Sequence, residues 1–240
     1  MANQASAWFI EALRLFPNSL RPLQRTNPTS ERAPMGHLKL LIEDGQITDP
    51  DSPRGKLLDK AARLFREKGY ERTTVRDIAA KVGIQSGSIF HHYSSKADIL
   101  MAVMVEALVY FTEELRDAID TAEGAEGKML ACIRSELQFT IGDDTIAMMS
   151  VLINEWRSLS PSHQEDILKY RAAYEKMWMD VLKGAKKSGL VAGDAFVLRR
   201  LLAGAIHWTP TWYDPAGKLS LEELTQETMR LACSQRSNEK

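Results

Sequence analysis

A short run of small polar and aromatic residues between Gln85 and Tyr93 carries the side chains best suited to recognise another molecule. Glutamine and serine can form hydrogen bonds with the edges of DNA bases, and aromatic rings can pack against sugars and thymine methyl groups. A glycine within the run has no side chain, so its backbone can approach a nucleic acid closely. The sequence therefore predicts DNA contacts from Gln85, Ser86, Gly87, Ser88, Phe90, His91, His92 and Tyr93.

Residues on both sides of this run have the chemistry that holds phosphates. Thr74 and Arg76 precede the run and Lys96 follows it. We expect all three at helix ends or flanks, where hydroxyls, cations and free amides position a duplex. Residues 53–100 contain ten Lys or Arg and five Asp or Glu, whereas residues 101–240 contain 16 and 21. A basic segment attached to an acidic body favours phosphate binding, although a solvated helix face would carry the same charge.

The sequence offers little support for catalysis or for a bound metal. His91 and His92 are neighbours, so on a helix their side chains would point about 100° apart, and no His-x-x-x-His pattern accompanies them. The chain also lacks a P-loop, a Gly-x-Gly-x-x-Gly motif and a nucleophile elbow. We therefore expect a protein that is not an enzyme and that has neither a metal site nor a cofactor. For Phe90 and Tyr93, a place in the hydrophobic core is left open as an alternative to DNA contact, and for Phe90 the two interpretations are equal.

The elements that must position these residues are helices. From Ser52 onward, apolar residues recur at helical spacing and no segment alternates with period two, which predicts an all-α fold. Gly83 should provide the turn of a helix-turn-helix, and Pro210 should kink or break a later helix. The expected helices are 53–68, 74–81, 86–92, 95–122, 126–141, 144–158, 161–188, 194–213 and 220–235. The residues expected to face inward around the turn are Leu64, Phe65, Tyr70, Ile78, Ala79, Val82, Ile84 and Ile89.

Composition and helix pattern divide the chain into four parts. Residues 1–52 are interrupted by prolines and are expected to be mostly disordered or loosely attached; the sequence leaves open whether translation begins at Met35 instead. Residues 53–100 are the expected helix-turn-helix DNA-binding domain. Residues 101–235 are the expected second helical domain, and residues 236–240 form a tail.

Large apolar residues gather on successive helices of the expected second domain, where they could line a ligand cavity. For each residue taken singly, an ordinary hydrophobic core is at least as good an interpretation. The candidates are Phe139, Met148, Met149, Leu152, Trp156, Tyr174, Trp178, Trp208 and Trp212.

Composition gives no indication of a membrane or of an oxidising compartment. No apolar run approaches the ~18–20 residues needed to span a bilayer. The two cysteines, Cys132 and Cys233, form no Cys-x-x-Cys pattern. The first residues lack a positive charge and Glu11 interrupts their apolar stretch, unlike a secretory signal. The expected location is the cytoplasm, with no membrane partner.

Residues 74–100 are similar to the DNA-binding unit of the TetR family of bacterial repressors. That unit reads approximately Thr-x-Arg-x-Ile-Ala-x-x-Ala-Gly-Val-Ser-x-Gly-x-Leu-Tyr-x-His-Phe-x-x-Lys-x-x-Leu. This chain matches it at Thr74, Arg76, Ile78, Ala79, Gly83, Gly87, His92, Lys96 and, at the last position, Ile99-Leu100. It departs at Val82, where the family usually has Ala, and at Gln85, where the family usually has a Ser or Thr cap. The second departure leaves the individual base contacts open.

The resemblance implies a ligand-responsive repressor that binds a palindromic DNA operator as a homodimer and leaves it when a small hydrophobic inducer binds. In this family the C-terminal helices hold the inducer and the last two pack against a second copy, which implies that residues 101–235 are the ligand-binding and dimerisation domain. Here that implies an interface formed by Leu198, Leu201, Leu202, Ala205, Leu224, Met229 and Leu231.

Residues 175–182 and 207–217, together with the His91-His92-Tyr93 run, are similar to one TetR subgroup. Its members repress steroid or fatty-acid catabolism genes and respond to acyl-CoA thioesters, which implies that the inducer is an acyl-CoA. Two other functions are left open. One is a transcriptional activator, and the other is a helical small-molecule-binding protein that does not bind DNA.

Overall fold

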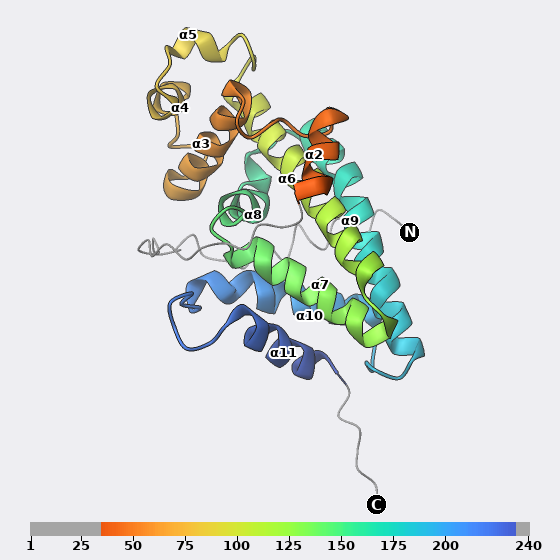
Figure 1. Cartoon of the computed structure of the whole chain (residues 1–240). Coiled ribbons are helices and arrows are strands. Elements are labelled where there is room, and N and C mark those ends of the chain that lie inside the picture. Colours follow the sequence, from red (N-terminus) through yellow and green to blue (C-terminus); the bar gives the residue numbers. More distant parts are fainter. Residues whose placement is uncertain (1–34, 234–240) are drawn as a thin grey trace, which may run out of the picture. The chain divides into compact units, whose positions relative to one another are not determined.

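The computed structural model describes residues 35–233, and every regular element within them is a helix (Figure 1). This confirms the expected all-α fold for that part of the chain. None of these helices is long and apolar enough to cross a membrane. In chain order they are α2 (Met35–Glu43), α3 (Pro53–Lys68), α4 (Val75–Val82), α5 (Ser86–Ile89), α6 (Lys96–Thr121), α7 (Gly124–Ile141), α8 (Ile146–Asn154), η2 (Trp156–Ser158), α9 (Pro161–Lys187), α10 (Ala195–Trp208), η3 (Thr209–Thr211) and α11 (Leu221–Ala232).

The chain divides into two compact units, and neither is one continuous stretch. The first contains the described residues up to Tyr110 together with Ile146–Arg171. The second contains Phe111–Thr145 and the described residues from Ala172 onward. Helices α6 and α9 therefore contribute residues to both units. Helix α8 and η2, which fall within the expected second domain 101–235, belong to the first unit.

Helix α3 begins and ends as its sequence predicts. The Ser52 hydroxyl accepts a hydrogen bond from Gly55 N at 3.0 Å, Pro53 occupies the first turn, and Gly69 ends the helix. Its apolar face enters one hydrophobic core shared with α4, α5, α6, α8 and the first part of α9. Glu155, which follows α8, adds a polar link, because its Oε1 accepts a hydrogen bond from Tyr70 N at 3.1 Å.

Helices α4 and α5 form the expected helix-turn-helix. Thr74 and Asp77 make a capping box, in which the Thr74 hydroxyl accepts from Asp77 N (3.1 Å) and the Asp77 carboxylate accepts from Thr74 N (2.9 Å). Gly83 ends α4 with φ 83°, a left-handed conformation that favours glycine. The prediction that the next helix continues to His92 is wrong. The amides of His92 and Tyr93 both donate to Ile89 O, and this tight turn closes α5 at Ile89.

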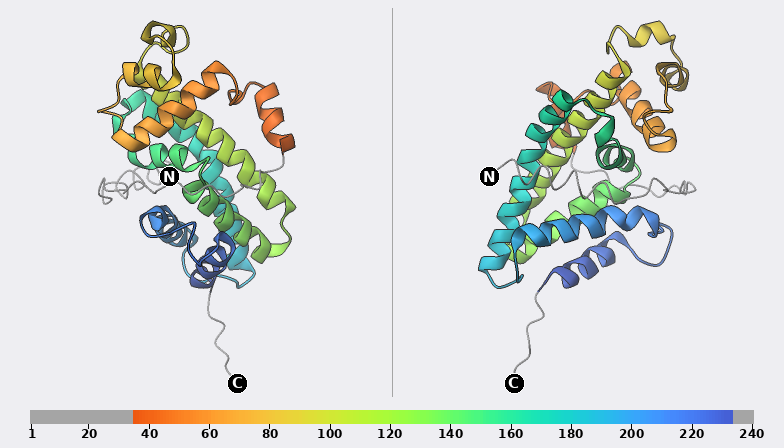
Figure 2. Two further views of the ribbon diagram at one scale, coloured as in Figure 1. Left: turned by 60° about the vertical axis from the view of Figure 1, so that its left-hand side comes forward. Right: turned by 180° about the vertical axis from the view of Figure 1, so that it is seen from behind.

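In the second unit, α7 packs against both α10 and α11 (Figures 1 and 2). The rings of Phe111 and Phe139 stack with centroids 4.4 Å apart. Helix α10 ends at Trp208, and Pro210 lies in the short 3-10 turn η3, so the expected break is confirmed. Helix α11 begins at a second capping box, formed by Ser220 and Glu223.

The N-terminal region differs from its expectation where the structure describes it. Residues 35–52 include helix α2, and Leu41 and Ile47 within this segment are buried. The expectation of disorder therefore does not hold for these residues. Residues 1–34 and the expected tail 236–240 lie outside the described part of the chain.

Candidate nucleic-acid interface

The turn after Gly83 presents most of the expected DNA-contacting side chains to solvent. Phe90 is 56% exposed, whereas Ile89 beside it is fully buried. Phe90 is therefore not a core residue, and the buried side chain of Ile89 anchors α5 to the hydrophobic core. Around this anchor Gln85, Gly87, Phe90, His91 and His92 are exposed, and Ser86 and Ser88 are half-buried.

One residue near the turn is exposed although it was expected to be buried. Ile84, expected in the core, is exposed. It follows the Gly83 turn and so lies beyond the inward face of α4. Val82 is half-buried and packs against the core, as expected. The turn consequently offers an apolar side chain beside the polar residues of α5.

Two of the candidate residues make internal contacts instead of joining the exposed group. The Tyr93 ring is buried, and its hydroxyl accepts a hydrogen bond from Arg54 Nε at 2.8 Å. Lys96 Nζ donates to the carbonyl oxygens of Tyr70 (2.8 Å) and Thr73 (2.9 Å) and lies 4.0 Å from the centroid of the Tyr70 ring. The prediction that Tyr93 faces outward is wrong, because its ring completes the core beneath α5. The Lys96 ammonium group is held by backbone carbonyls.

The remaining phosphate-binding candidates lie at the start of α4. Arg76 is exposed on the first turn of the helix. Thr74 is exposed as well, but its hydroxyl takes part in the capping box with Asp77. The hydrogen bonds from Thr74 lower the pKa of the Asp77 carboxyl, which keeps the cap charged. DNA contact by these residues stays a prediction.

The expected ligand-pocket residues are divided between the two units. Met148, Met149, Leu152 and Trp156 belong to the first unit, where Trp156 lies in the core beneath α3. In the second unit, Phe139, Tyr174 and Trp178 are buried, while Trp208 and Trp212 are exposed. The last two therefore lie on the surface of their unit instead of facing inward.

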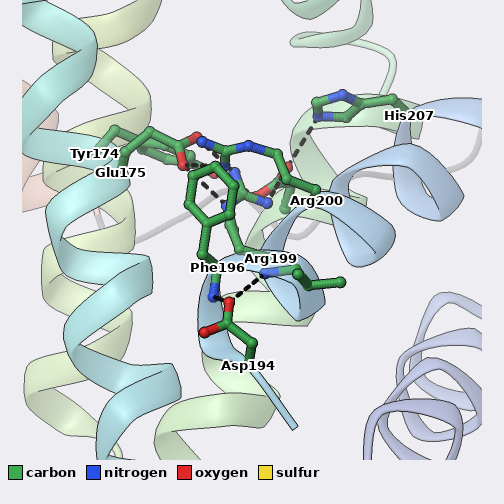
Figure 3. A network of polar contacts seen from close by, with 9 residues as sticks. Tyr174, Glu175, Asp194, Phe196, Arg199, Arg200 and His207 are labelled. Carbon is green, nitrogen blue, oxygen red and sulfur yellow. Dashed lines mark hydrogen bonds and ion pairs between the residues drawn. The ribbon is translucent and has the colours of Figure 1, made fainter. Parts of the chain in front are cut away.

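A cluster of buried charged residues in the second unit was not anticipated from the sequence (Figure 3). Arg199 on α10 is fully buried and binds two carboxylates. Its Nη1 lies 3.1 Å from Oε1 of Glu136 on α7, and its Nη2 lies 2.9 Å from Oε1 of Glu175 on α9. Glu136 also accepts a hydrogen bond from the Tyr174 hydroxyl (3.1 Å), and His207 Nε2 lies 2.9 Å from its Oε1. Glu136, Tyr174 and Arg199 are buried, and Glu175 and His207 are half-buried; we call these five residues the buried charge cluster.

The electrostatics of this cluster follow from its burial. Burial alone would raise the pKa of Glu136, but the charge of Arg199 and the contact with His207 outweigh it and lower that pKa to about 2. Burial, with the nearby Glu136 charge, raises the pKa of the Cys132 thiol to about 12. Glu136 is therefore a carboxylate at neutral pH, and Cys132 is a protonated, unreactive thiol. The Arg199 guanidinium also lies over the Trp178 ring, 4.4 Å from its centroid.

Exposed apolar side chains form a stripe on the second unit. Val197, Leu201 and Trp208 are exposed and follow one another at helical spacing on α10, and the exposed Trp212 comes directly after η3. Of the residues implied for a dimer interface, Leu201, Ala205 and Leu231 are exposed, and Leu198 is half-buried. Leu202, Leu224 and Met229 are buried within their own unit and are not available to a partner.

No three His, Cys, Asp or Glu side chains of residues 35–233 are grouped so that they could hold a metal ion.

Two stretches of the chain match known protein families. Residues 57–103 match "Bacterial regulatory proteins, tetR family", and residues 122–235 match "Tetracyclin repressor-like, C-terminal domain".

Comparison with individual proteins agrees with these matches. The HTH-type transcriptional repressor KstR2 of Mycolicibacterium smegmatis is 30% identical over 187 residues, which cover 77% of this chain and 90% of that protein. A crystal structure described as superantigen pfit is 47% identical with a TM-score of 0.73, covering 85% of this chain and 100% of that one. AibR, in complex with isovaleryl coenzyme A and operator DNA, shares the fold at 22% identity with a TM-score of 0.69, over 76% of this chain and 98% of its own. Since both family descriptions and a repressor matched over most of its length agree, the chain belongs to the TetR family of bacterial regulatory proteins.

Proposed function

We propose that this protein is a repressor that binds a palindromic DNA operator with α5 and is released by a small hydrophobic ligand. The observation that carries the proposal is the arrangement around Ile89. One buried side chain fixes a single helical turn, and Gln85, Phe90 and His91 around it face solvent. Proteins recognise bases in the major groove through side chains that form hydrogen bonds with base edges and through rings that pack on thymine methyl groups. The name of the relative KstR2 supports repression as the direction of control.

The apolar stripe on the second unit supports a homodimer. Leu201 is 66% exposed, Val197 and Trp208 share its helical spacing on α10, and Trp212, which follows η3, is exposed as well. Contiguous apolar surface of this kind marks an interaction site. A second copy of the chain would cover it and would bring two α5 helices to successive major grooves of a palindrome.

The inducer proposal is an acyl-CoA thioester. It rests on the similarity of residues 175–182 and 207–217 to the acyl-CoA-responsive subgroup. AibR adds only that this fold can hold an acyl-CoA and operator DNA together. In the second unit, the buried rings of Phe139, Tyr174 and Trp178 are the apolar candidates for contact with the acyl chain.

DNA binding is tested by enriching random double-stranded DNA on the purified protein and measuring the affinity of the enriched sequence by fluorescence anisotropy at increasing salt. We expect affinity to fall steeply as salt rises, because bound phosphates release counterions. Phe90→Ala and Gln85→Ala should each weaken binding about 10-fold, whereas Tyr170→Ala, at another exposed aromatic residue, should not. Affinity that is independent of both salt and sequence would contradict operator binding. It would favour the alternative function, a helical small-molecule-binding protein that does not bind DNA.

Ligand control is tested on the same complex. Isovaleryl coenzyme A and octanoyl coenzyme A are added to the operator complex, with free coenzyme A as the control. Release by an acyl-CoA but not by coenzyme A supports the proposal, because only a ligand that binds the two states differently can shift them. Native mass spectrometry of the freshly purified protein weighs any retained ligand and counts the subunits. Release by neither thioester at saturating concentration contradicts the acyl-CoA assignment.

A further inference from the structure

Residues 35–52, which we call the N-terminal strap, precede the tetR match that begins at residue 57. They are nevertheless attached to the first unit. After α2 the chain turns back at Gly45 (φ 68°), and Ile47 N donates to Leu41 O at 3.3 Å. Leu41 and Ile47 are both buried. The strap is therefore a packed element of this unit.

A threonine ties the strap to helix α6. Thr48 donates two hydrogen bonds to the carboxylate of Glu106, one from Oγ1 to Oε1 (2.5 Å) and one from the backbone N to Oε2 (3.2 Å). Hydrogen bonds to a charged acceptor are stronger than neutral ones, and two donors fix the orientation of the carboxylate. The strap thus determines where the Glu106 charge lies.

Glu106 in turn faces the first turn of α3. Its Oε1 lies 4.0 Å from Arg54 Nη2. Arg54 Nε donates a hydrogen bond to the Tyr93 hydroxyl at 2.8 Å, and its guanidinium carbon lies 5.4 Å from the centroid of the Tyr93 ring. The bond to Tyr93 raises the pKa of Arg54, and burial raises the pKa of Tyr93. Arg54 therefore keeps the proton that it donates to the Tyr93 hydroxyl oxygen at neutral pH.

The strap also touches α3 directly at Gly55. A Cβ atom at this position would lie 2.1 Å from Asp49 O and 2.8 Å from the Cα of Pro50. Only glycine allows the backbone of the strap to approach the helix so closely. The strap is accordingly fixed at two places, both beside the contact between Arg54 and Tyr93.

Tyr93 connects this chain of contacts to the candidate recognition helix, because Tyr93 N donates to Ile89 O at 3.0 Å. We infer that the N-terminal strap positions α5 for DNA through Thr48, Glu106, Arg54 and Tyr93. The inference rests on the proposed function of α5 in reading DNA. All four are positioning residues, which act on DNA through α5.

Arg54 has a second conceivable role, because half of its side chain is exposed and could bind a phosphate itself. The two roles differ in their salt dependence. A phosphate contact contributes about one unit to the slope of log affinity against log salt, and a positioning contact contributes none. Arg54→Gln should therefore weaken operator binding and leave the slope unchanged.

The main test compares operator binding by Thr48→Val, Tyr93→Phe and the double variant. Each single change removes one hydrogen-bonding group with little change of shape and should weaken binding about 3- to 10-fold at an unchanged salt slope. The double variant should be no weaker than the weaker-binding single variant, because both changes interrupt the same chain of contacts. Thr48→Ser keeps the hydroxyl and should bind like the unmodified protein. Thr121→Val is the matched control, since that hydroxyl bonds carbonyls of its own helix.

Amide hydrogen exchange without DNA gives a readout that does not depend on binding. Exchange in residues 86–93 should be faster in Thr48→Val than in Thr121→Val. Unchanged exchange in Thr48→Val, or a salt slope reduced by about one in Arg54→Gln, would overturn the inference. If the unmodified protein shows no salt-dependent DNA binding, the proposed function fails, and the exchange comparison still decides whether the strap controls α5.

Discussion

Arg199 shows at the scale of a single residue what the sequence conceals. The run Leu198-Arg199-Arg200-Leu201 predicts a helix with a polar face but does not tell which arginine enters the core. The carboxylates that bind Arg199 come from Glu136 and Glu175, 63 and 24 residues away along the chain. Helical periodicity describes neighbours within one helix, so it could not predict an ion cluster formed by three.

Removing the cation of the buried charge cluster should destabilise the protein strongly. Arg199→Met leaves the Glu136 carboxylate buried without its main counter-charge, so the free energy of unfolding should fall by about 3–5 kcal/mol. Combining Arg199→Met with Glu136→Gln should recover part of the loss, because the uncompensated charge disappears. Lys176→Met, which removes an exposed pair with Asp180, should change stability by less than about 1 kcal/mol. Urea unfolding of the four proteins checks the order.

The same cluster should make the protein sensitive to acid. The pKa of Glu136 falls from 4.5 when the residue is free to about 2 in the fold, so its stabilising contribution is complete above pH 4.5. That contribution, about 3 kcal/mol by linkage, should be lost as the pH falls from 4.5 towards 2. Glu136→Gln should have a lower stability at neutral pH and a flatter dependence over this window. Equal slopes for the two proteins in urea unfolding at several pH values would contradict this assignment.

At the scale of elements, two glycines of the helix-turn-helix make opposite predictions. Neither has an atom within 4 Å of a Cβ placed on it, but Gly83 has φ 83° and Gly87 lies within α5. Gly83→Ala should therefore destabilise the fold by about 1 kcal/mol through backbone strain. Gly87→Ala should leave stability equal or slightly higher, because alanine favours a helix, yet weaken operator binding if DNA approaches this backbone closely. Thermal unfolding and anisotropy measured on both variants separate the two effects. DNA affinity unchanged in Gly87→Ala would remove the close-approach argument.

The sequence predicted the elements best where a local cap defines them. The expected helix starts at 53, 74 and 220 lie within a residue of the observed ones, and each start has a side-chain cap, from Ser52, from Thr74 with Asp77, or from Ser220 with Glu223. The end of α5 was missed, because it depends on two amides sharing the Ile89 carbonyl, which no residue type signals. Helix α2 was missed as well, since the prolines around it suggested disorder and the hydrogen bonds that tie its segment to the unit, from Thr48 to Glu106, join residues distant in sequence.

At the scale of the whole molecule, the exposed stripe on α10 and η3 predicts an assembly. Leu201→Glu places a charge in the middle of the stripe and should convert a dimer to a monomer, with operator affinity lowered by at least about 10-fold. Tyr170→Glu, at an exposed aromatic residue of the first unit, is the matched control and should keep the dimer. Sedimentation equilibrium measures the outcome. A monomeric unmodified protein would remove the dimer from the proposed function.

The division into units was the part least accessible to sequence reasoning. Residues were grouped by chain order, so Met148, Met149, Leu152 and Trp156 were assigned with Tyr174 and Trp178 to one pocket. The structure instead places the first four in the unit that carries α5. Apolar character alone indicates a buried residue but not which unit it packs in, and the ligand pocket stays a prediction.

The first unit is built from two separate stretches of the chain, so no continuous fragment contains all of it without part of the second unit. Ala147, Val151 and Trp156 complete the core that holds α3 and α4, although Phe111–Thr145 of the second unit separates them in the chain from the earlier part of the first unit. A fragment that stops at Tyr110 would lack these three side chains and would expose the apolar faces of α3 and α4 that they cover. Such a fragment should be insoluble or molten. The helix-turn-helix segment therefore cannot be fused alone to another ligand-binding domain. Chimeric proteins should retain DNA binding only when they also carry residues 146–171.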